Sequence, residues 1–174
     1  MKRIALLAIA LLLLSGCSGE EVTTPRQVPA SCEINGVIAA FDEQVPGSAY
    51  VPTEWEPFEG TDLAATLDNG GIACTYSIQV AEVGGTILWA PADDALWGER
   101  SIGWKEAGQS SIDLPGIEEE AAFILQDGTS ADEMHVWAIN ILIDGIWIQV
   151  GATFLQTVDE ALPIIESAIE ATES

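Results

Sequence analysis

The turn Asp144-Gly145 is the feature of this sequence that most constrains its fold. It separates two runs, residues 134–143 and 146–154, and the alternation of each run is typical of a β-strand. An Asp-Gly pair favours a two-residue hairpin turn, because both turn residues need a positive backbone φ angle. The turn fixes the register and places four pairs on one face: Ile143 with Ile146, Ile141 with Ile148, Ile139 with Val150, and Trp137 with Ala152. The sequence therefore predicts an antiparallel sheet with one continuous apolar face.

The segments around this hairpin carry further helical and strand patterns. Residues 32–43 have apolar side chains at helical spacing, residues 72–80 alternate as a half-buried strand does, and Gly84-Gly85 is interpreted as a hairpin turn. The remaining predicted elements are a helix at 61–67, a strand at 86–90, a helix at 93–107, a strand at 121–126, and a helix that begins at the capping box 157–160 and bends near Pro163. We expect an α+β domain, with N-terminal, middle and C-terminal helices packed on one face of an antiparallel sheet of about five strands.

The N-terminus has the features of a targeting segment. Lys2 and Arg3 precede the apolar run Ile4–Leu14, which as a helix spans roughly 16 Å, about half of a membrane's hydrocarbon core. Leu14-Ser15-Gly16-Cys17 is similar to the lipobox of bacterial lipoproteins, and the alternative is a secretory signal with a chance cysteine. The resemblance implies cleavage before Cys17 and acylation of that residue, which anchors the protein on the outer face of the cytoplasmic membrane.

This interpretation divides the chain into three parts. Residues 1–16 are a lipoprotein signal peptide, and residues 17–31 are the lipidated cysteine and a flexible tether that has two prolines and little apolar content. Residues 32–174 form a single α+β domain, which is long enough to bury its own core.

The chain is strongly acidic. All 28 acidic residues lie after residue 17, where only Arg26, Arg100 and Lys105 are basic, so the processed chain has a side-chain charge of −25. Such a surface repels phosphate groups, and we expect no nucleic-acid partner. It can attract cations, basic peptides or calcium, or it can simply keep the protein soluble. The even spread of the acids along the chain favours the second interpretation.

Two cysteines remain once Cys17 is acylated. In an oxidising compartment Cys32 and Cys74 are expected to form a disulfide. Metal ligation is the competing interpretation, but the chain has one histidine to support it. We therefore predict no metal site and no cofactor.

Several motifs together resemble a known group of proteins. They are Cys17 in its lipobox, Pro29-Ala30-Ser31-Cys32 before a helix, Cys74-Thr75-Tyr76 in the first strand, Leu114-Pro115-Gly116, and the terminal strand-strand-helix. The chain resembles small actinobacterial lipoproteins of unknown function, which are similar in plan to the extracellular sensor domain of a mycobacterial receptor kinase. Those proteins often carry Trp where this chain has Tyr76. The resemblance implies an envelope-anchored α+β domain with a disulfide, and it brings no catalytic residues.

Catalytic motifs are missing from the sequence. His135 is the only imidazole, and its place on the hairpin favours a partly covered sheet residue over a general base. No nucleophile motif and no phosphate-binding glycine loop occurs. Residues 127–133 offer oxygens near a turn, but they lack the alternating ligands of calcium loops. We therefore expect a protein that is not an enzyme.

One predicted loop has an unusual composition. Between residues 50 and 59, aromatic and acidic side chains alternate with prolines. The candidate binding residues are Tyr50, Glu54, Trp55, Glu56, Phe58 and Glu59. If these side chains are exposed, they can bind a basic peptide, an amine or a sugar through stacking and charge. Alternatively, Trp55 and Phe58 cover the core. A second candidate surface is a groove made by Trp89, Trp97 and Trp104, for which core packing is again the alternative.

The function that these features favour is a lipid-anchored extracytoplasmic binding or interaction module. Its expected partners are the membrane, reached through the anchor on Cys17, and either an envelope protein or a small cationic ligand. Two alternatives stay open: a carboxylate-dependent hydrolase of envelope polymers, and a structural spacer that binds no ligand.

Overall fold

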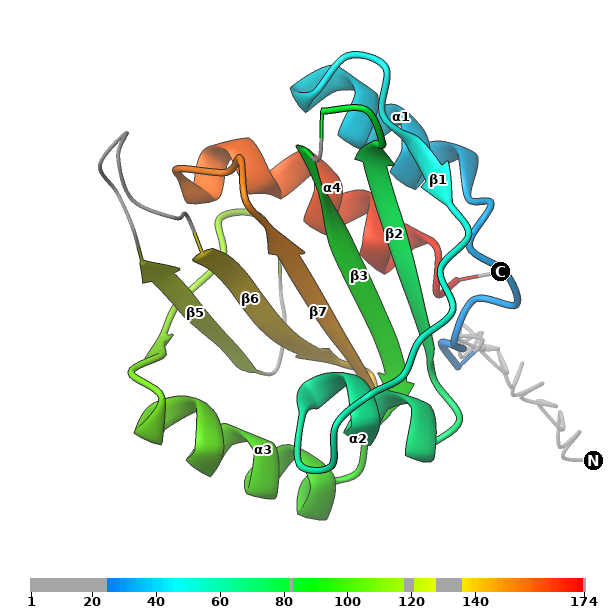
Figure 1. Cartoon of the computed structure of the whole chain (residues 1–174). Coiled ribbons are helices and arrows are strands. Elements are labelled where there is room, and N and C mark those ends of the chain that lie inside the picture. Colours follow the sequence, from blue (N-terminus) through cyan, green and yellow to red (C-terminus); the bar gives the residue numbers. More distant parts are fainter. Residues whose placement is uncertain (1–24, 82, 118–120, 128–135, 174) are drawn as a thin grey trace, which may run out of the picture.

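Seven antiparallel strands form one sheet in the order β1-β2-β3-β7-β6-β5-β4 (Figure 1). The structure, a computed structural model, describes residues 25–81, 83–117, 121–127 and 136–173. The strands are β1 (Ala49–Val51), β2 (Ile72–Ile78), β3 (Val83–Pro91), β4 (Ser110–Ser111), β5 (Ala121–Asp127), β6 (Val136–Ile143) and β7 (Ile146–Ala152). The helices are α1 (Asn35–Gln44), α2 (Asp62–Asp68), α3 (Asp94–Glu106) and α4 (Val158–Glu170). The α+β class is confirmed, and none of the helices in these residues is long and apolar enough to cross a membrane.

The hairpin β6–β7 has the predicted register. Ile143 pairs with Ile146, Ile141 with Ile148, Ile139 with Val150, and Trp137 with Ala152. Asp144 and Gly145 have φ angles of 47° and 76°, the left-handed conformation that the turn requires. The turn and the alternation were enough to predict this element correctly.

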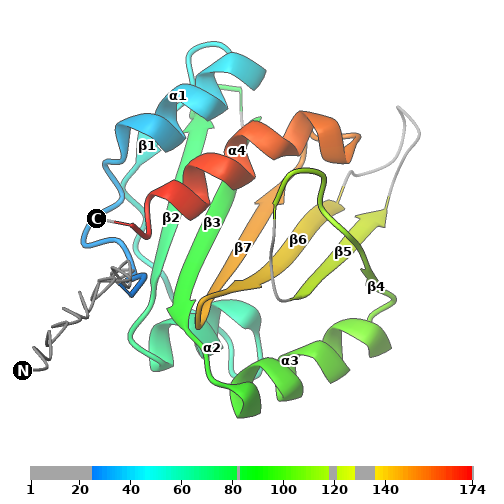
Figure 2. The ribbon, with the colours of Figure 1, turned by 180° about the vertical axis from the view of Figure 1, so that it is seen from behind.

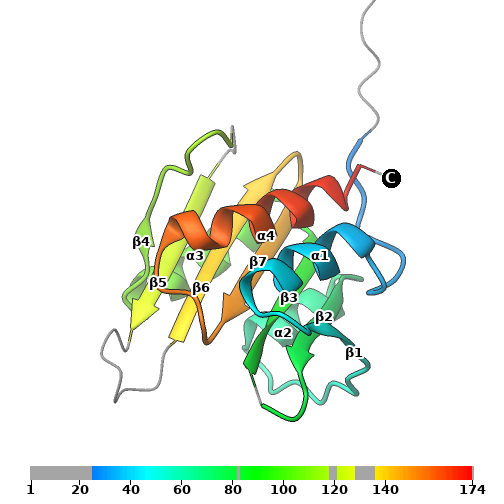
Figure 3. The same ribbon diagram turned by 90° about the horizontal axis from the view of Figure 1, so that it is seen from above.

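One face of the sheet is covered by α1 and α4, which lie side by side across it (Figures 2 and 3). The largest buried side chains on this face include Trp89, Trp137, Phe41 and the isoleucines of β6 and β7. Trp89 donates a hydrogen bond of 2.9 Å from Nε1 to the carbonyl of Ala168 in α4, so its only polar atom is satisfied inside the core. This layer is the main hydrophobic core.

The opposite face carries a second, smaller core under α2 and α3 (Figure 1). Trp104 of α3 packs there against Phe123 and Trp147, with ring-centroid distances of 5.8 and 5.5 Å. The prediction that all helices pack on one face is therefore wrong. The physical reason is that β3, β6 and β7 are apolar on both faces, as Leu142 and Trp147 show, so both faces need cover.

The number of strands also differs from the prediction. The edge strands β1 and β4 are too short to give an alternating pattern. The predicted turn at Gly84-Gly85 is wrong, because both glycines lie inside β3 and pair with Ser77 and Tyr76. A Cβ atom at Gly85 would lie 2.6 Å from the Gly151 carbonyl oxygen and 2.9 Å from the Phe41 ring. These glycines are thus required by close packing and not by a turn.

The N-terminal segment 25–31 contacts the end of α4. Arg26 donates to the Asp144 carboxylate at 2.9 Å and to the Ile169 carbonyl at 3.1 Å, and it forms an ion pair of 3.0 Å with Glu173. The Gln27 backbone N–H donates to the Thr172 carbonyl at 2.8 Å. The predicted signal peptide, Cys17, residues 128–133 of the weighed calcium loop and His135 lie outside the described residues.

The Cys32–Cys74 disulfide generates the first prediction. It joins residues 42 positions apart, and the chain-entropy model gives about 4 kcal/mol for a loop of this length. We expect the Cys32→Ala/Cys74→Ala variant to lose about that much free energy of unfolding, measured by urea denaturation. Dithiothreitol should destabilise the native protein by a similar amount and leave the variant unchanged. A loss below about 1 kcal/mol would show that the covalent link contributes little to stability.

Candidate functional site

The disulfide anchors one wall of a surface hollow. Cys74 is buried in β2 and Cys32 is half-buried before α1, with 5.4 Å between their Cα atoms. The Tyr76 hydroxyl donates a 2.9 Å hydrogen bond to the Cys32 carbonyl. Burial, and secondarily the neighbouring Tyr50, raise the pKa of Tyr76, so that hydroxyl stays protonated. The backbone at residue 32 is therefore fixed twice, once by the covalent bond and once by the hydrogen bond.

The hollow lies between this wall, β1 and the start of β2, and its volume is about 520 Å³. We name it the Trp55 hollow, and its lining residues are Ala30, Ser31, Cys32, Glu33, Tyr50, Trp55, Leu67, Ile72 and Ala73. The indole Nε1 of Trp55 donates to the Ala73 carbonyl at 2.9 Å. Because that bond fixes the orientation of the ring, the Trp55 hollow has an aromatic wall that is already in place.

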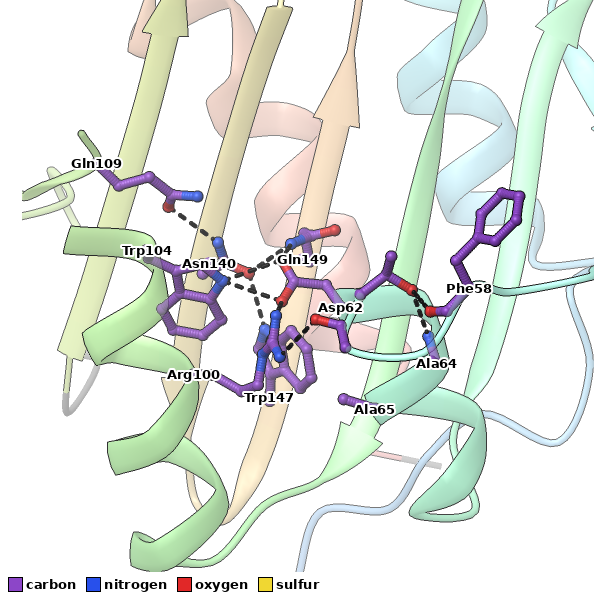
Figure 4. A network of polar contacts seen from close by, with 12 residues as sticks. Phe58, Asp62, Ala64, Ala65, Arg100, Trp104, Gln109, Asn140, Trp147 and Gln149 are labelled. Carbon is purple, nitrogen blue, oxygen red and sulfur yellow. Dashed lines mark hydrogen bonds and ion pairs between the residues drawn. The ribbon is translucent and has the colours of Figure 1, made fainter. Parts of the chain in front are cut away.

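The structure brings only two of the six sequence-predicted residues into this hollow. Tyr50 lies in β1 and Trp55 follows it, both half-buried. The other four are exposed and do not line it: Glu54, Glu56, Phe58 and Glu59. The Phe58 side chain is 83% exposed beside the N-terminus of α2 (Figure 4), so it does not cover the core. Composition identified the loop but could not distinguish these two groups of residues.

Other lining residues were missed by the sequence reasoning. Glu33 supplies the only carboxylate of the Trp55 hollow, and Leu67 and Ile72 supply apolar contacts from α2 and β2. They come from three separate segments, which the disulfide and the β1–β2 pairing bring together. No local sequence pattern signals such a convergence.

The three tryptophans proposed to line a groove do not share a surface. Trp89 is fully buried under α4, on the face opposite to Trp97 and Trp104. Trp97 and Trp104 pack edge to face, with 4.9 Å between their ring centroids, inside the second core. Core packing, the alternative that the sequence left open, is what the structure shows for Trp89 and Trp104.

A polar network connects α2 and α3 to the sheet (Figure 4). Asp62, in the first turn of α2, accepts hydrogen bonds from Arg100 and Trp104 of α3 and from Gln149 of β7. The Arg100 Nε–Oδ1 distance is 2.8 Å and the Trp104 Nε1–Oδ2 distance is 2.9 Å; Arg100 Nη2 makes a second bond to Oδ1. Both carboxylate oxygens are therefore occupied by protein donors.

The network continues into the sheet through Asn140, which is fully buried. Its Oδ1 accepts from Trp147 Nε1 at 2.9 Å and from Gln149 Nε2 at 2.8 Å, and its Nδ2 donates to Gln109 at 3.1 Å. Each of these donors has an acceptor, so the network holds α2 and α3 in a defined position on the sheet.

Comparisons with known proteins add nothing to this geometry, because no family model, no curated protein and no solved structure matches the chain. Among the residues that the structure describes, no three histidine, cysteine or acidic side chains lie close enough together to hold a metal ion. The Trp55 hollow, which two of the sequence-predicted residues line, is therefore taken as the candidate site.

The polar network generates the second prediction. We expect Asp62→Asn to lower the free energy of unfolding by about 2–3 kcal/mol, because it leaves the Arg100 guanidinium, which is only 17% exposed, without its counter-charge. Asp68→Asn is the matched control, since Asp68 is exposed at the other end of α2 and makes no ion pair with a described residue. Equal stability of the two variants in urea denaturation would show that the network contributes no stability.

Proposed function

We propose that this protein is a lipid-anchored binding module, held on the outer face of the cytoplasmic membrane through Cys17, and that the Trp55 hollow is its ligand site. The observation that carries the proposal is the pair of aromatic walls, Tyr50 and Trp55, beside the Glu33 carboxylate. Aromatic faces and a carboxylate together suit a cation, which gains both cation–π and ionic attraction.

The charge of the chain supports a cationic ligand. The three basic residues of the described chain are engaged elsewhere: Arg26 with Asp144 and Glu173, Arg100 with Asp62, and Lys105 over the Phe123 ring at 5.1 Å. None of them lines the Trp55 hollow, while Glu54 and Glu56 flank Trp55 in the chain. The ligand is thus a small organic cation or a basic group on an envelope protein.

No specific observation favours the alternative of a carboxylate-dependent hydrolase. Such an enzyme needs a carboxylate with a lone pair free for a substrate or a water molecule. Asp62, the carboxylate with the most hydrogen-bond partners, has both oxygens occupied by three side chains. Asp62 is therefore not available as a general base, and we propose no catalytic role for this protein.

The anchor is tested by labelling. In a bacterial host fed an alkyne fatty acid, we expect the full chain to become labelled and to sediment with membranes. Cys17→Ala should lose the label and leave the membrane fraction. If Cys17→Ala keeps its N-terminus uncleaved and still sediments with membranes, the apolar run at residues 4–14 itself holds the protein on the membrane.

The hollow is tested with two matched probes. We expect calorimetry on the lipidated protein in zwitterionic nanodiscs to detect Nα-acetyl-lysine amide, and Nα-acetyl-norleucine amide to bind about tenfold more weakly because it lacks the charge. Trp55→Ala and Glu33→Gln should each weaken binding of the lysine probe, with folding checked by urea denaturation.

Phe58→Ala is the matched control, because Phe58 is an exposed aromatic residue of the same loop that does not line the hollow. It should leave the affinity unchanged. Absence of binding for both probes, or equal effects of Phe58→Ala and Trp55→Ala, would contradict the proposed site.

A further inference from the structure

A second hollow adjoins the Trp55 hollow at Tyr50. We name it the Val80 hollow; its volume is about 330 Å³, and its lining residues are Gly47, Ala49, Tyr50, Val51, Pro52, Ser77, Ile78, Gln79 and Val80. Tyr50 lines both hollows, so together they form one surface along β1. Val80 is 96% exposed, the highest value among the exposed large apolar side chains, and half-buried Ile78 adds to the apolar character of this end.

The strand between the two hollows is the free edge of the sheet. β1 is the outermost strand on its side, and it pairs with β2 through Ala49–Ser77, Tyr50–Tyr76 and Val51–Thr75. The Trp55 bond to the Ala73 carbonyl shows that residue 73 directs its backbone groups away from β3. The direction of the backbone groups alternates along a strand, so those of residues 75 and 77 face β1 and those of Tyr76 face β3. Because Tyr50 pairs with Tyr76, the N–H and C=O groups of Tyr50 point outward, away from the sheet.

The charge around this edge has one sign. Glu33 lines the Trp55 hollow, and Asp42, Glu43 and Glu54 are exposed on the segments next to it. No basic residue lines either hollow. A second copy of this chain, with a side-chain charge of −25 after processing, is therefore disfavoured here by repulsion, and a basic partner is attracted.

We propose that the edge formed by the two hollows binds an extended, basic segment of an envelope polypeptide, which forms a short β-bridge with Tyr50. The proposal rests on the proposed function and adds the partner class to it. An extended chain places side chains on alternating sides, so one residue can enter the Trp55 hollow while another contacts Val80. Pro52, which has no N–H to donate, limits the bridge to the backbone groups of Tyr50 and keeps the edge from pairing along its length.

The probe is the capped peptide acetyl-Lys-Val-Lys-Val-Lys-amide, titrated against the lipidated full chain in zwitterionic nanodiscs. We expect it to bind at least about tenfold more tightly than Nα-acetyl-lysine amide, because it contacts both hollows and the edge. The same peptide with every lysine replaced by glutamate should not bind. A version with N-methylated valines, which cannot donate to the Tyr50 carbonyl, should bind more weakly.

Val80→Ser is the decisive variant, since its exposed side chain contributes little to folding. It should lower affinity for the peptide about fivefold and leave affinity for the lysine probe unchanged. Ile102→Ser is the matched control, because Ile102 is an exposed apolar residue on α3, outside both hollows, and it should change neither affinity.

The outcomes separate this inference from the proposed function. The lysine probe can bind at Trp55 while the peptide binds no more tightly than that probe and Val80→Ser leaves the peptide's affinity unchanged. In that case the extended partner is wrong and the binding site stands. If neither probe binds, both proposals fail. If sedimentation shows that wild-type protein dimerises and Val80→Ser abolishes the dimer, a second copy occupies the edge and the basic partner is wrong.

Discussion

The pairing of β7 with both β3 and β6 is the interaction on which the rest of the structure depends. Along β7, isoleucine and valine side chains enter the core under α1 and α4, while Trp147 and Gln149 enter the opposite layer. One strand thus supplies both cores. Because apolar area on both faces of a strand must be removed from water, helices are required on each side of the sheet.

The two layers are stabilised in different ways. The layer under α1 and α4 is almost wholly apolar, and its tryptophan N–H at residue 89 bonds to the helix above it. The layer under α2 and α3 mixes aromatic rings with the Asp62–Asn140 network. Hydrogen bonds need a defined geometry and apolar contacts do not, so the network sets where these two helices lie on the sheet.

How much the sequence predicts depends on whether a signal is local. The β6–β7 register was predictable because the turn Asp144-Gly145 and the alternation lie within one segment. The helix α3 was also predicted despite Gly98 and Gly103, since Asp93 caps it through the Leu96 N–H and Trp104 packs it onto the sheet. The Cys32–Cys74 disulfide followed from counting cysteines.

The errors and omissions come from tertiary context. The second layer was not predicted, because the hairpin face that carries Trp147 also carries the polar residue Asn140. Gly84-Gly85 was interpreted as a turn, although close packing explains both glycines. Within the candidate site, the composition of loop 50–59 pointed to Tyr50 and Trp55, yet Glu33 and Leu67 join these residues only after folding. Assigning them required the three-dimensional structure.

The position of the disulfide has a mechanical consequence. A force applied to the N-terminus acts first on the contacts of Arg26 with Asp144 and Glu173, and then on residue 32. From there the force passes through the covalent link directly into β2 at residue 74, in the body of the sheet. Residues 33–73, which include α1, β1, α2 and Trp55, lie outside this load path. While the sheet holds, tension on the chain therefore bypasses the loop that the disulfide closes, and with it α1, β1, α2 and Trp55.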